Sequence, residues 1–408
     1  MKISRGFQFK LDPTSEQADA FARNAGVCRL VYNVALEQRS NWYRQFRRAT
    51  GYPISMASQC RELTLLRAEF DWIAEGSVTA QQQTLRDMDS AFRNFFRGTA
   101  GYPTPRKKGV NDSFRIQGNQ VEFRRLNRSW GVVKLPKIGE VRFRWTRDIR
   151  GKLKNVTVSL YPLGWHVSFC TEQDIEVGRN SGAAVGIDRG ITRALAFSDG
   201  TFGDLPKVRM NVLERKAKRH SRGLSRSKKG SNRRKKTRRL LAAQKARTAR
   251  IRKHFNHVQS CRISKSYGIA VVEALKTKNM TASATGTVEE PGTNVAQKTG
   301  LNRGILSVGW FQFETFLIYK MATTGGEVRQ VSPMHTSTTC SCCGVNERKH
   351  RKSQAVYECD ACGSAMNADH NAAINILKAG TRPATSGRTI ARKRESHLES
   401  VGPIGLAA

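Results

Sequence analysis

Four cysteines in two pairs constrain the fold of this chain more than any other feature. Cys340 and Cys343 are separated by two residues, as are Cys359 and Cys362, and fifteen residues lie between the pairs. This spacing is typical of a zinc ribbon, in which two tight turns present four sulfurs to one ion. The sequence therefore predicts one structural zinc ion. The spacing favours Cys343 over its neighbour Cys342 as the ligand, although the two could exchange roles.

The charge of the chain indicates a polyanionic partner. Its 408 residues include 71 Lys and Arg but only 32 Asp and Glu, which gives a formal net charge of +39. A protein with this imbalance repels itself unless a polyanion is present, so nucleic acid is the expected partner. Charge alone also fits a ribosomal or chromatin-like basic protein. The length predicts two or three domains.

Other features predict a protein of the cytosol, or of the nucleus if the host has one. The first ten residues lack the apolar core of a signal peptide, and no window approaches 18 apolar residues, so no membrane span is expected. Four further cysteines stand singly among apolar neighbours, which is typical of buried thiols and not of a disulfide framework. These are Cys28, Cys60, Cys170 and Cys261.

The first half of the chain changes its hydrophobic period twice. Residues 2–11 alternate as a strand, and Thr14 with Gln17 fits a capping box that opens a helical region reaching about Arg97. Interruptions are expected at residues 51–53 and at Gly76. Residues 101–108 contain two prolines and predict a stiff basic connector. Residues 113–175 alternate in short runs and predict an antiparallel barrel or sandwich.

Aromatic and basic residues interleave at two places in the helical region. Such interleaving suits nucleic acid, because rings stack on bases while guanidinium groups contact phosphates. An amphipathic helix with aromatics in the core and arginines in solvent explains it equally well. The residues are Trp42, Tyr43, Arg44, Phe46, Arg47 and Arg48, and Phe92, Arg93, Phe95, Phe96 and Arg97.

The second half alternates buried strands with helices. Residues 183–200 predict a strand, a tight turn and a returning strand, and residues 269–273 predict a second apolar strand. Between them, residues 207–253 contain 21 Lys or Arg and one acid, Glu214, which predicts long polar helices and favours a surface that faces phosphates. The remaining elements are expected as a flexible loop at 282–300, an amphipathic helix at 307–321, a strand at 328–333, a helix at 370–378 and a disordered tail from 379.

Three carboxylates stand where these elements begin or end. Asp188 and Glu273 each end a run that reads as a buried strand, and Asp369 begins a helix. If the two strands are parallel neighbours, both acids reach one edge of a sheet, where open α/β sheets place their sites. Each acid also has a structural alternative. Asp188 could cap a turn, Glu273 could pair with a cation, and Asp369 could cap its helix.

A converging trio of acids would suit two magnesium ions. Magnesium prefers oxygen ligands, and paired ions activate a water and stabilise the leaving oxygen in phosphodiester cleavage. The chain contains no Gly-x4-Gly-Lys-Ser/Thr phosphate loop and no His-Glu-x2-His pair. The eight histidines are expected at the surface or bound to backbone, and Asp360, between two cysteines, is expected to solvate its turn.

Six short motifs stand out along the chain. They are Gly186-Ile-Asp-Arg-Gly, Val272-Glu-Ala-Leu, Thr336-Ser-Thr-Thr-Cys-Ser-Cys-Cys-Gly and Asp369-His-Asn-Ala-Ala-Ile-Asn-Ile, with Arg29-Leu-Val-Tyr-Asn and Pro105-Arg-Lys-Lys. Together these motifs resemble the TnpB family of transposon-encoded, RNA-guided nucleases, which are similar to compact ancestors of type V CRISPR effectors. One departure is Asn367-Ala368 before the last acid, where the family often has Asp-Arg.

The resemblance implies an α/β and β multidomain fold with an RNase H-like RuvC nuclease domain. Asp188, Glu273 and Asp369 are then the catalytic acids that bind magnesium, and Cys340, Cys343, Cys359 and Cys362 bind zinc. The implied division is a wedge-like β-barrel at 1–13 and 101–180, a helical recognition domain at 14–100, the nuclease domain at 181–333 and 367–378, the zinc ribbon at 334–366 and the basic tail at 379–408.

We therefore predict an RNA-guided DNA endonuclease that acts as a monomer with one RNA, in a prokaryotic cytoplasm and on the nucleoid when DNA is bound. The family implies a guide RNA from the transposon end, double-stranded target DNA and a short flanking motif. Because base pairing with the guide reads the target sequence, the protein itself mainly needs to bind nucleic-acid backbones.

The alternatives are an RNA-guided repressor without cleavage, an RNA-independent RNase H-like nuclease or transposase, and a basic RNA-packaging protein. A repressor would be expected to lack one of the acids, and all three are present.

Overall fold

The computed structural model describes residues 1–42, 44–46, 54–287 and 289–382. The chain divides into two compact units, the first covering Met1–Ile175 and the second beginning at Glu176. This division falls five residues before the predicted start of the nuclease domain at 181. The predicted interruption at 51–53 and most of the predicted tail lie outside the described residues.

The first unit is built on one antiparallel sheet of seven strands. Its order is β2-β6-β7-β1-β5-β4-β3. The predicted strand at 2–11 is confirmed as β1 (Lys2–Asp12), which pairs with β7 along most of its length and with β5 at its end. The other strands are β2 (Ser113–Gln117), β3 (Glu122–Arg125), β4 (Trp130–Leu135), β5 (Gly139–Arg144), β6 (Lys152–Tyr161) and β7 (Gly164–Asp174).

This sheet curls around its own core. Alternate side chains such as Val156, Val158, Val167 and Phe169 are fully buried on one face. Phe123 on β3 packs against Phe169 on β7 with ring centroids 5.0 Å apart, although three strands separate them in the sheet. The antiparallel prediction is confirmed, and the curvature gives a partial barrel whose ends are β2 and β3.

Helices of the first unit cover the sheet and form a second core. The predicted capping box opens α1 (Ser15–Glu37), with reciprocal bonds between Thr14 and Gln17. A π-helical turn, η1 (Gln38–Trp42), follows. The remaining helices are α3 (Met56–Glu69), α4 (Asp71–Ala74) and α5 (Val78–Phe96), and a short 3-10 turn at Gly118–Gln120 links β2 to β3.

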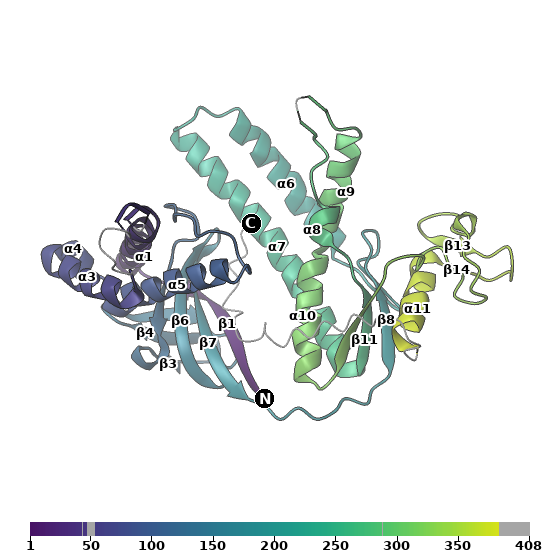
Figure 1. Ribbon diagram of the computed structural model, residues 1–408, viewed down its shortest axis with the longest axis horizontal. Helices are drawn as coiled ribbons and strands as arrows, with labels where there is room; N and C mark the ends of the chain where they lie inside the picture. The colour runs from purple at the N-terminus through teal and green to yellow at the C-terminus, as the bar shows by residue number, and fades with distance from the viewer. Residues whose placement is uncertain (43, 47–53, 288, 383–408) are drawn as a thin grey trace. The chain divides into compact units, whose positions relative to one another are not determined.

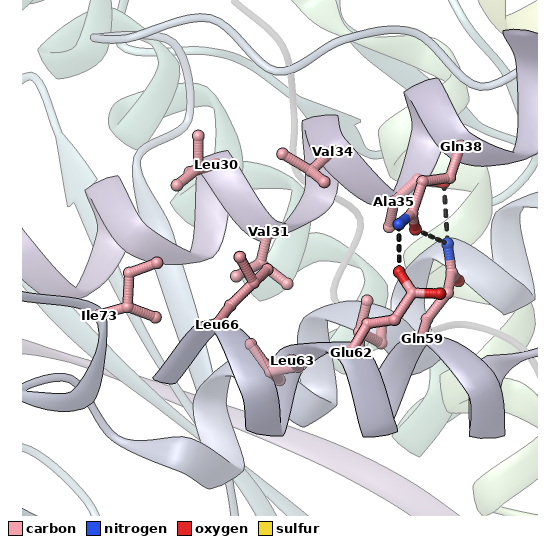
Figure 2. A pocket seen from close by; sticks show the side chains of 11 residues that line it. Leu30, Val31, Val34, Ala35, Gln38, Gln59, Glu62, Leu63, Leu66 and Ile73 are labelled. Atoms are coloured by element: carbon pink, nitrogen blue, oxygen red, sulfur yellow. Dashed lines mark hydrogen bonds between the residues drawn. The ribbon is translucent and has the colours of Figure 1, made fainter. Parts of the chain in front are cut away.

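A groove lies between α1 and α3. Figure 2 shows apolar side chains such as Val31 and Leu63 along it, with Gln38, Gln59 and Glu62 gathered at one end. Glu62 accepts a hydrogen bond from Gln38 there. The lining of the groove therefore contains one carboxylate, which is already hydrogen-bonded.

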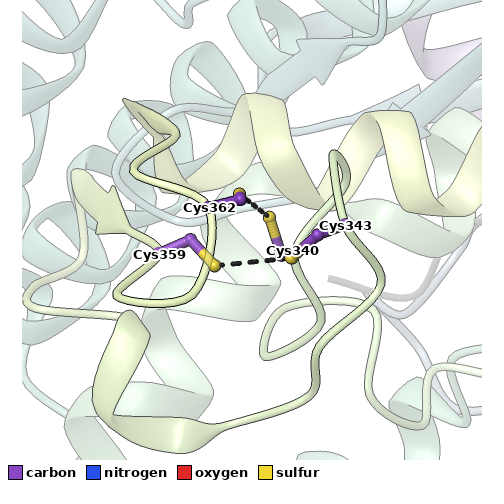
Figure 3. A group of neighbouring side chains, drawn as sticks. All are labelled: Cys340, Cys343, Cys359 and Cys362. Carbon is purple, nitrogen blue, oxygen red and sulfur yellow. Dashed lines mark hydrogen bonds between the residues drawn. The ribbon is translucent and has the colours of Figure 1, made fainter.

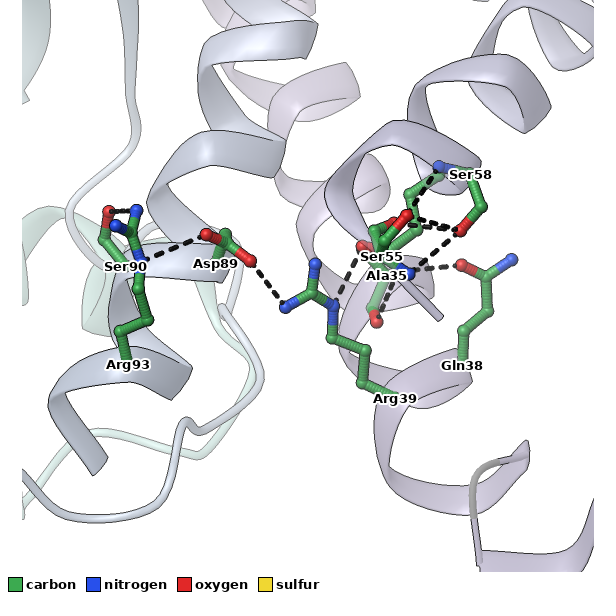
Figure 4. Close-up of polar contacts among 9 residues, drawn as sticks. Ala35, Gln38, Arg39, Ser55, Ser58, Asp89, Ser90 and Arg93 are labelled. Carbon is green, nitrogen blue, oxygen red and sulfur yellow. Dashed lines mark hydrogen bonds and ion pairs between the residues drawn. The ribbon is translucent and has the colours of Figure 1, made fainter. Parts of the chain in front are cut away.

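Arg39 ties the π-helical turn to two other helices. Its guanidinium donates to Gln59 on α3 (3.0 Å) and to Asp89 on α5 (3.2 Å), as Figure 4 shows. Asp89 also pairs with Arg93 at 3.1 Å. Arg39 lies 5.5 Å from the ring centroid of Phe92 as well. This network fixes α1, α3 and α5 to one another.

The second unit contains a five-stranded mixed sheet of order β10-β9-β8-β11-β12. The two strands that carry the candidate acids, β8 (Ala184–Asp188) and β11 (Ile269–Glu273), are parallel neighbours, and β12 (Glu327–Val331) extends the parallel set. β9 (Leu195–Phe197) and β10 (Phe202–Gly203) run antiparallel to their neighbours. The predicted strand, turn and returning strand at 183–200 is confirmed.

Helices lie on both faces of this sheet. Figure 1 shows α11 (Ala368–Thr381) on one side of β8 and β11, and α10 (Trp310–Thr323) on the other. The basic block forms the predicted long helices, α6 (Lys207–Ser225) and α7 (Asn232–Ser266). Two more helices, α8 (Thr277–Met280) and α9 (Val295–Val308), follow β11.

Three predictions for this unit need correction. The expected loop at 282–300 is helical from Val295, and the expected single helix at 307–321 is broken between α9 and α10. The break is at Gly309, whose φ of 75° lies in the left-handed region that favours glycine. The last helix runs to Thr381, past the expected start of the tail at 379. Among the described residues, no helix is long and apolar enough to span a membrane.

Candidate metal centres and nucleic-acid surfaces

The cysteine cluster is built from two similar turns. Cys340 accepts a hydrogen bond from the N–H of Gly344, and Cys359 accepts one from Gly363. Both glycines have φ in the left-handed region, 81° and 70°. Each pair thus uses a Cys-x2-Cys-Gly turn that brings its two sulfurs to one side. A short hairpin, β13 (Val356–Glu358) and β14 (Ala365–Asn367), carries the second turn.

The sulfurs of these turns fit a zinc ion. Figure 3 shows the four side chains converging, and their Sγ atoms all lie within 4.8 Å of one another. The Cys340–Cys362 and Cys343–Cys359 sulfurs are 3.7 and 3.6 Å apart. Four thiolates at 2.3 Å in a tetrahedron would be separated by about 3.8 Å. Cys342 is exposed and only its backbone N–H reaches the cluster.

Strand alternation turns two of the candidate acids toward the same face of the sheet. Val185, Ile187, Ala270 and Val272 pack into the core beneath α10. Because neighbouring residues on a strand face opposite ways, the acids that follow these residues face α11. Ile187 is aligned with Val272 in the parallel ladder, so the acids next to them, Asp188 and Glu273, are neighbours at the strand ends.

A glycine in β8 brings the third acid to this face. A Cβ on Gly186 would lie 2.1 Å from the carbonyl oxygen of Ala373 and 2.7 Å from the nitrogen of Leu377, both in α11. The helix therefore rests directly on the strand, and Asp369 in its first turn lies over the strand ends. Asn367, not Asp369, caps the helix, because its side chain accepts from the N–H groups of Asp369 and His370. The capping alternative for Asp369 is wrong.

Burial and mutual repulsion make the trio hard to ionise. The pKa of Asp188 is raised to about 7 by burial first, then by the charges of Glu273 and Asp369. Burial also raises the pKa of Glu273 and of Asp369. Carboxylates held together in this way are stabilised by a bound cation. The donor set is all oxygen, and it fits a hard divalent ion such as magnesium.

Glu273 is held by contacts that the sequence did not reveal. It is 9% exposed, and its carboxylate accepts a hydrogen bond of 2.6 Å from the hydroxyl of Thr336. Among the described residues, no ion pair of the Glu273 carboxylate lies within 4.0 Å, although the charge of nearby Arg189 lowers its pKa against the effect of burial. The guanidinium of Arg189 instead donates to the backbone carbonyl of Glu273.

Asp369 has a cation from the ribbon beside it. Arg351, just after the 3-10 turn η3 (Arg348–His350), lies 3.5 Å from the Asp369 carboxylate and lowers its pKa against the effect of burial. Nothing in the spacing of the sequence singled out Arg351. Thr336 begins one of the family motifs, and Arg189 directly follows the first acid. Both positions could be noticed in the sequence, but the sequence did not predict their contacts with Glu273.

A row of polar residues on α11 binds the first cysteine turn. Asn371 accepts from the N–H of Ser341 (2.8 Å) and donates to the carbonyl of Thr339 (2.8 Å). One turn later, Asn375 donates to the carbonyls of Thr336 (3.0 Å) and Thr339 (2.7 Å). The helix that carries Asp369 and the ribbon are therefore fixed to each other.

One histidine of the ribbon departs from expectation. His350 was predicted at the surface or bound to backbone, yet it is 1% exposed and packs edge-on against Tyr357. Its Nε2 lies 3.6 Å from Glu347 and 3.8 Å from Asp360. Asp360 also accepts from Lys352 at 3.3 Å, so it pairs with cations of the ribbon as well as meeting solvent.

The long helices α6 and α7 present a basic surface. They lie against each other, and α7 also packs on α10. The one acid of the block, Glu214, pairs with Lys218 at 3.6 Å, which leaves the block strongly positive. A surface of this kind suits a phosphate backbone, which Lys and Arg bind without reading sequence.

The aromatic residues near the end of α5 fit the amphipathic explanation only in part. Phe92 is buried in the helical core, whereas Phe96 is 78% exposed. The exposed ring is part of a cluster in which the centroid of Phe95 lies 5.3 Å from Phe96 and 5.2 Å from Tyr102. Within the first interleaved stretch, Tyr43, Arg47 and Arg48 lie outside the described residues, as does the side chain of Trp42.

Comparison with known proteins identifies the family. The chain is 36% identical, over 100% of both sequences, to the protein named "Putative RNA-guided DNA endonuclease InsQ" of Escherichia coli (strain K12). It is 32% identical over 97% of its length to a "Putative RNA-guided DNA endonuclease" of Streptomyces pristinaespiralis, of which it covers 94%. The chain belongs to the TnpB family.

Family models agree with this TnpB assignment. Residues 310–376 match the Cas12f1-like TNB domain, and this range includes the ribbon and the start of α11. Residues 168–284, a range that includes β8 and β11, match a model described as "Probable transposase". Residues 1–48 match a model described as a helix-turn-helix domain, although residues 1–42 form β1, α1 and η1 here.

Solved structures of CRISPR effectors share the fold of this TnpB protein. A Cas12f1–sgRNA–target DNA complex matches with a TM-score of 0.56 at 16% identity, covering 89% of this chain and 83% of that one. The mini-RNA-guided endonuclease Cas_phi3 matches with a TM-score of 0.54 at 9% identity, covering 95% and 94%. At these identities the likeness concerns the fold, which mixes α and β structure.

Proposed function

We propose that this TnpB protein cuts double-stranded DNA under the direction of a guide RNA. The observation that carries the proposal is the convergence of three carboxylates at the carboxyl ends of two parallel strands. The names of its full-length relatives, which call them RNA-guided DNA endonucleases, support the guided activity. The fold shared with effectors whose solved complexes contain guide RNA and target DNA supports the same partners.

In this proposal, Asp188, Glu273 and Asp369 are the catalytic acids of an RNase H-like RuvC domain and hold two magnesium ions. When bound, the ions supply an activated water and stabilise the leaving oxygen of the phosphodiester. The chain itself supplies the oxygen ligands, fixes their spacing through the strand register and the packing of α11, and keeps them partly shielded from water. The four cysteines hold one zinc ion that folds the ribbon.

The nucleic acid would be held by backbone contacts. Base pairing with the guide reads the target sequence, so the protein needs a positive surface more than it needs base-reading side chains. We assign α6 and α7 to phosphate contacts, and the partial barrel with its helices to the guide RNA and the flanking motif, as a wedge-like domain with a recognition insertion. We propose that one protein chain acts with one RNA.

The test begins with the protein purified from cells together with its bound nucleic acid. The RNA is sequenced, and a DNA duplex that matches its guide segment, placed beside a randomised flank, is incubated with the complex and Mg²⁺. We expect a discrete RNA and cleavage that requires the match, a particular flank and the metal. The Asp188→Ala complex is the control and should bind the same RNA without cutting.

Each alternative gives a different result. Matched binding without cleavage by the parent would favour the repressor. Cleavage of unmatched duplexes without a discrete RNA would favour an RNA-independent nuclease. Equal cutting by the parent and by Asp188→Ala would remove the three acids from the mechanism while leaving guided binding in place.

A further inference from the structure

Glu273 is held both at its carboxylate and at its backbone carbonyl, by side chains from two different segments of the second unit. Its carboxylate oxygen Oε1 accepts from the Thr336 hydroxyl at 2.6 Å in a buried contact. Its backbone carbonyl accepts from the guanidinium of Arg189.

The grip at the backbone carbonyl is anchored by a buried ion pair. The Arg189 side chain is 0% exposed, and its Nη1 lies 2.7 Å from Glu314 Oε2 on α10. The second oxygen of Glu314 accepts from Gln330 on β12. Burying a guanidinium is costly unless its charge is paired, and both Nη atoms of Arg189 have partners, whereas its buried Nε has none among the described residues. Arg189 is therefore held in place, and its hydrogen bond to the Glu273 carbonyl restrains the end of β11.

The hydrogen bond to the Glu273 carboxylate comes from Thr336, which lies in the segment that joins β12 to the ribbon. The carbonyl of Thr336 accepts from Asn375 on α11 at 3.0 Å, so the residue is held from both its backbone and its hydroxyl. A hydroxyl has one proton to donate, and the Thr336 oxygen lies 2.6 Å from Glu273 Oε1 and 3.2 Å from the carbonyl oxygen of Pro333, so the shorter contact to the carboxylate is favoured. The carboxylate of Glu273 is thereby kept in one orientation, with its other oxygen left over for a ligand.

We propose that Thr336 and Arg189 are positioning residues that clamp Glu273, one by its carboxylate and one by its backbone. Neither touches the reacting atoms, and the pair connects α10 and the ribbon segment to a single metal-binding acid. The inference rests on the proposed function, because a clamp on Glu273 matters for cleavage only if Glu273 acts there. Residues that orient metal ligands in this way commonly change metal affinity or activity about 10- to 100-fold when removed.

The test measures target cleavage by the protein–guide RNA complex across a range of Mg²⁺ concentrations. Thr336→Val keeps the shape of the side chain but loses the donor. We expect the Mg²⁺ concentration for half-maximal rate to rise about tenfold or more, with a lower maximal rate. Thr336→Ser, which restores a hydroxyl, should return both values close to those of the parent.

Thr338→Val is the matched control, because this hydroxyl lies two residues away and donates to Asn346 at 2.6 Å instead of to an acid. Arg189→Lys tests the second grip, since a lysine keeps the charge but cannot bridge Glu314 and the Glu273 carbonyl with a planar fork. The double variant of Arg189→Lys and Thr336→Val should lower the cleavage rate by less than the product of the two single effects, because both residues act on Glu273. Mn²⁺ binding, measured by electron paramagnetic resonance on the same complexes, gives a readout independent of cutting.

The outcomes separate the clamp from the proposed function. If Glu273→Gln cuts as well as the parent, the site assignment itself is wrong. If Glu273→Gln is inactive but Thr336→Val keeps the parent's Mg²⁺ dependence and Mn²⁺ affinity, the clamp alone is wrong. A Thr336→Val complex that melts earlier without any change in metal dependence would also overturn the clamp, because that is what a purely structural contact gives.

Discussion

The cysteine cluster and the acid trio are two candidate metal centres that differ in how they are made. The four sulfurs come from 23 consecutive residues, and each pair sits on its own short turn. The three carboxylates come from positions 188, 273 and 369, and they meet only after two strands pair and a helix packs across them. The first centre thus needs local geometry, and the second needs the whole unit to be folded.

The two centres also differ in what they leave unsatisfied. The sulfurs enclose one point and, with four ligands, leave no position for a substrate, which is typical of a structural zinc site. The acids are crowded together, with Arg351 beside the carboxylate of Asp369 and Arg189 on the backbone carbonyl of Glu273. In the proposed function, this repulsion would be relieved by ions that retain open positions, which is what a catalytic site requires.

The largest effect is expected from removing a carboxylate. Asp188→Ala should lower the cleavage rate of a matched target by about 10³-fold or more, because the residue contacts the proposed ions directly. Zinc content and guide RNA binding should stay the same, since neither depends on this side chain. The rate is measured under single-turnover conditions, and elemental analysis reports the zinc. Loss of zinc in this variant would show that the two centres are not independent.

Removing a sulfur should act through the fold. Cys340→Ser should reduce zinc from one ion per chain to none, because three thiolates hold the ion far less tightly than four. The row of hydrogen bonds between the first turn and α11 then loses its support, and we expect cleavage to fall by about 10²-fold. Cys342→Ser is the control, and it should keep both zinc and activity. If it lost zinc instead, Cys342 would have taken the role assigned to Cys343.

The acid centre should respond to pH near neutrality. The raised pKa of Asp188, about 7, means that protons compete with Mg²⁺ below that value. The Mg²⁺ concentration for half-maximal cleavage should therefore fall by about tenfold between pH 6 and pH 8. A half-maximal concentration that stays constant over this range would contradict the raised pKa.

Without Mg²⁺, the free energy of unfolding should decrease as the pH rises, whereas cleavage with Mg²⁺ should improve. The folded protein binds the Asp188 proton more tightly than the unfolded chain does, so this group stabilises the fold at low pH. Its contribution is lost as the pH rises from about 4 to about 7. The melting temperature of the Asp188→Asn variant, which has no such proton, should depend less on pH over that window when both proteins are compared in Mg²⁺-free buffer.

Sequence patterns predicted these regions to different extents, and the reason is physical. Cysteine spacing and strand endings are local, so both sets of ligand candidates could be chosen before any fold was known. Contacts such as Thr336 to Glu273 or Arg351 to Asp369 depend on how distant segments lie against each other. The break at Gly309 was missed for a related reason: a glycine within an apolar helical pattern is tolerated, and only the packing reveals the left-handed turn.

The smallest effect tests how closely the acid centre depends on packing. Gly186→Ala adds a Cβ where the carbonyl oxygen of Ala373 would be 2.1 Å away, so α11 must shift. Overpacking of this kind costs about 1–3 kcal/mol of unfolding free energy, which corresponds to a drop of several degrees in melting temperature. The shift displaces Asp369 from its partners, so cleavage should fall by more than the loss of folded protein explains, while zinc remains bound.

Gly300→Ala is the matched control, because no atom lies within 4 Å of its Cβ position in α9 and alanine favours the helix. If both variants melted and cut like the parent, α11 could adjust freely, and the close contact at Gly186 would not be what sets the position of the third acid.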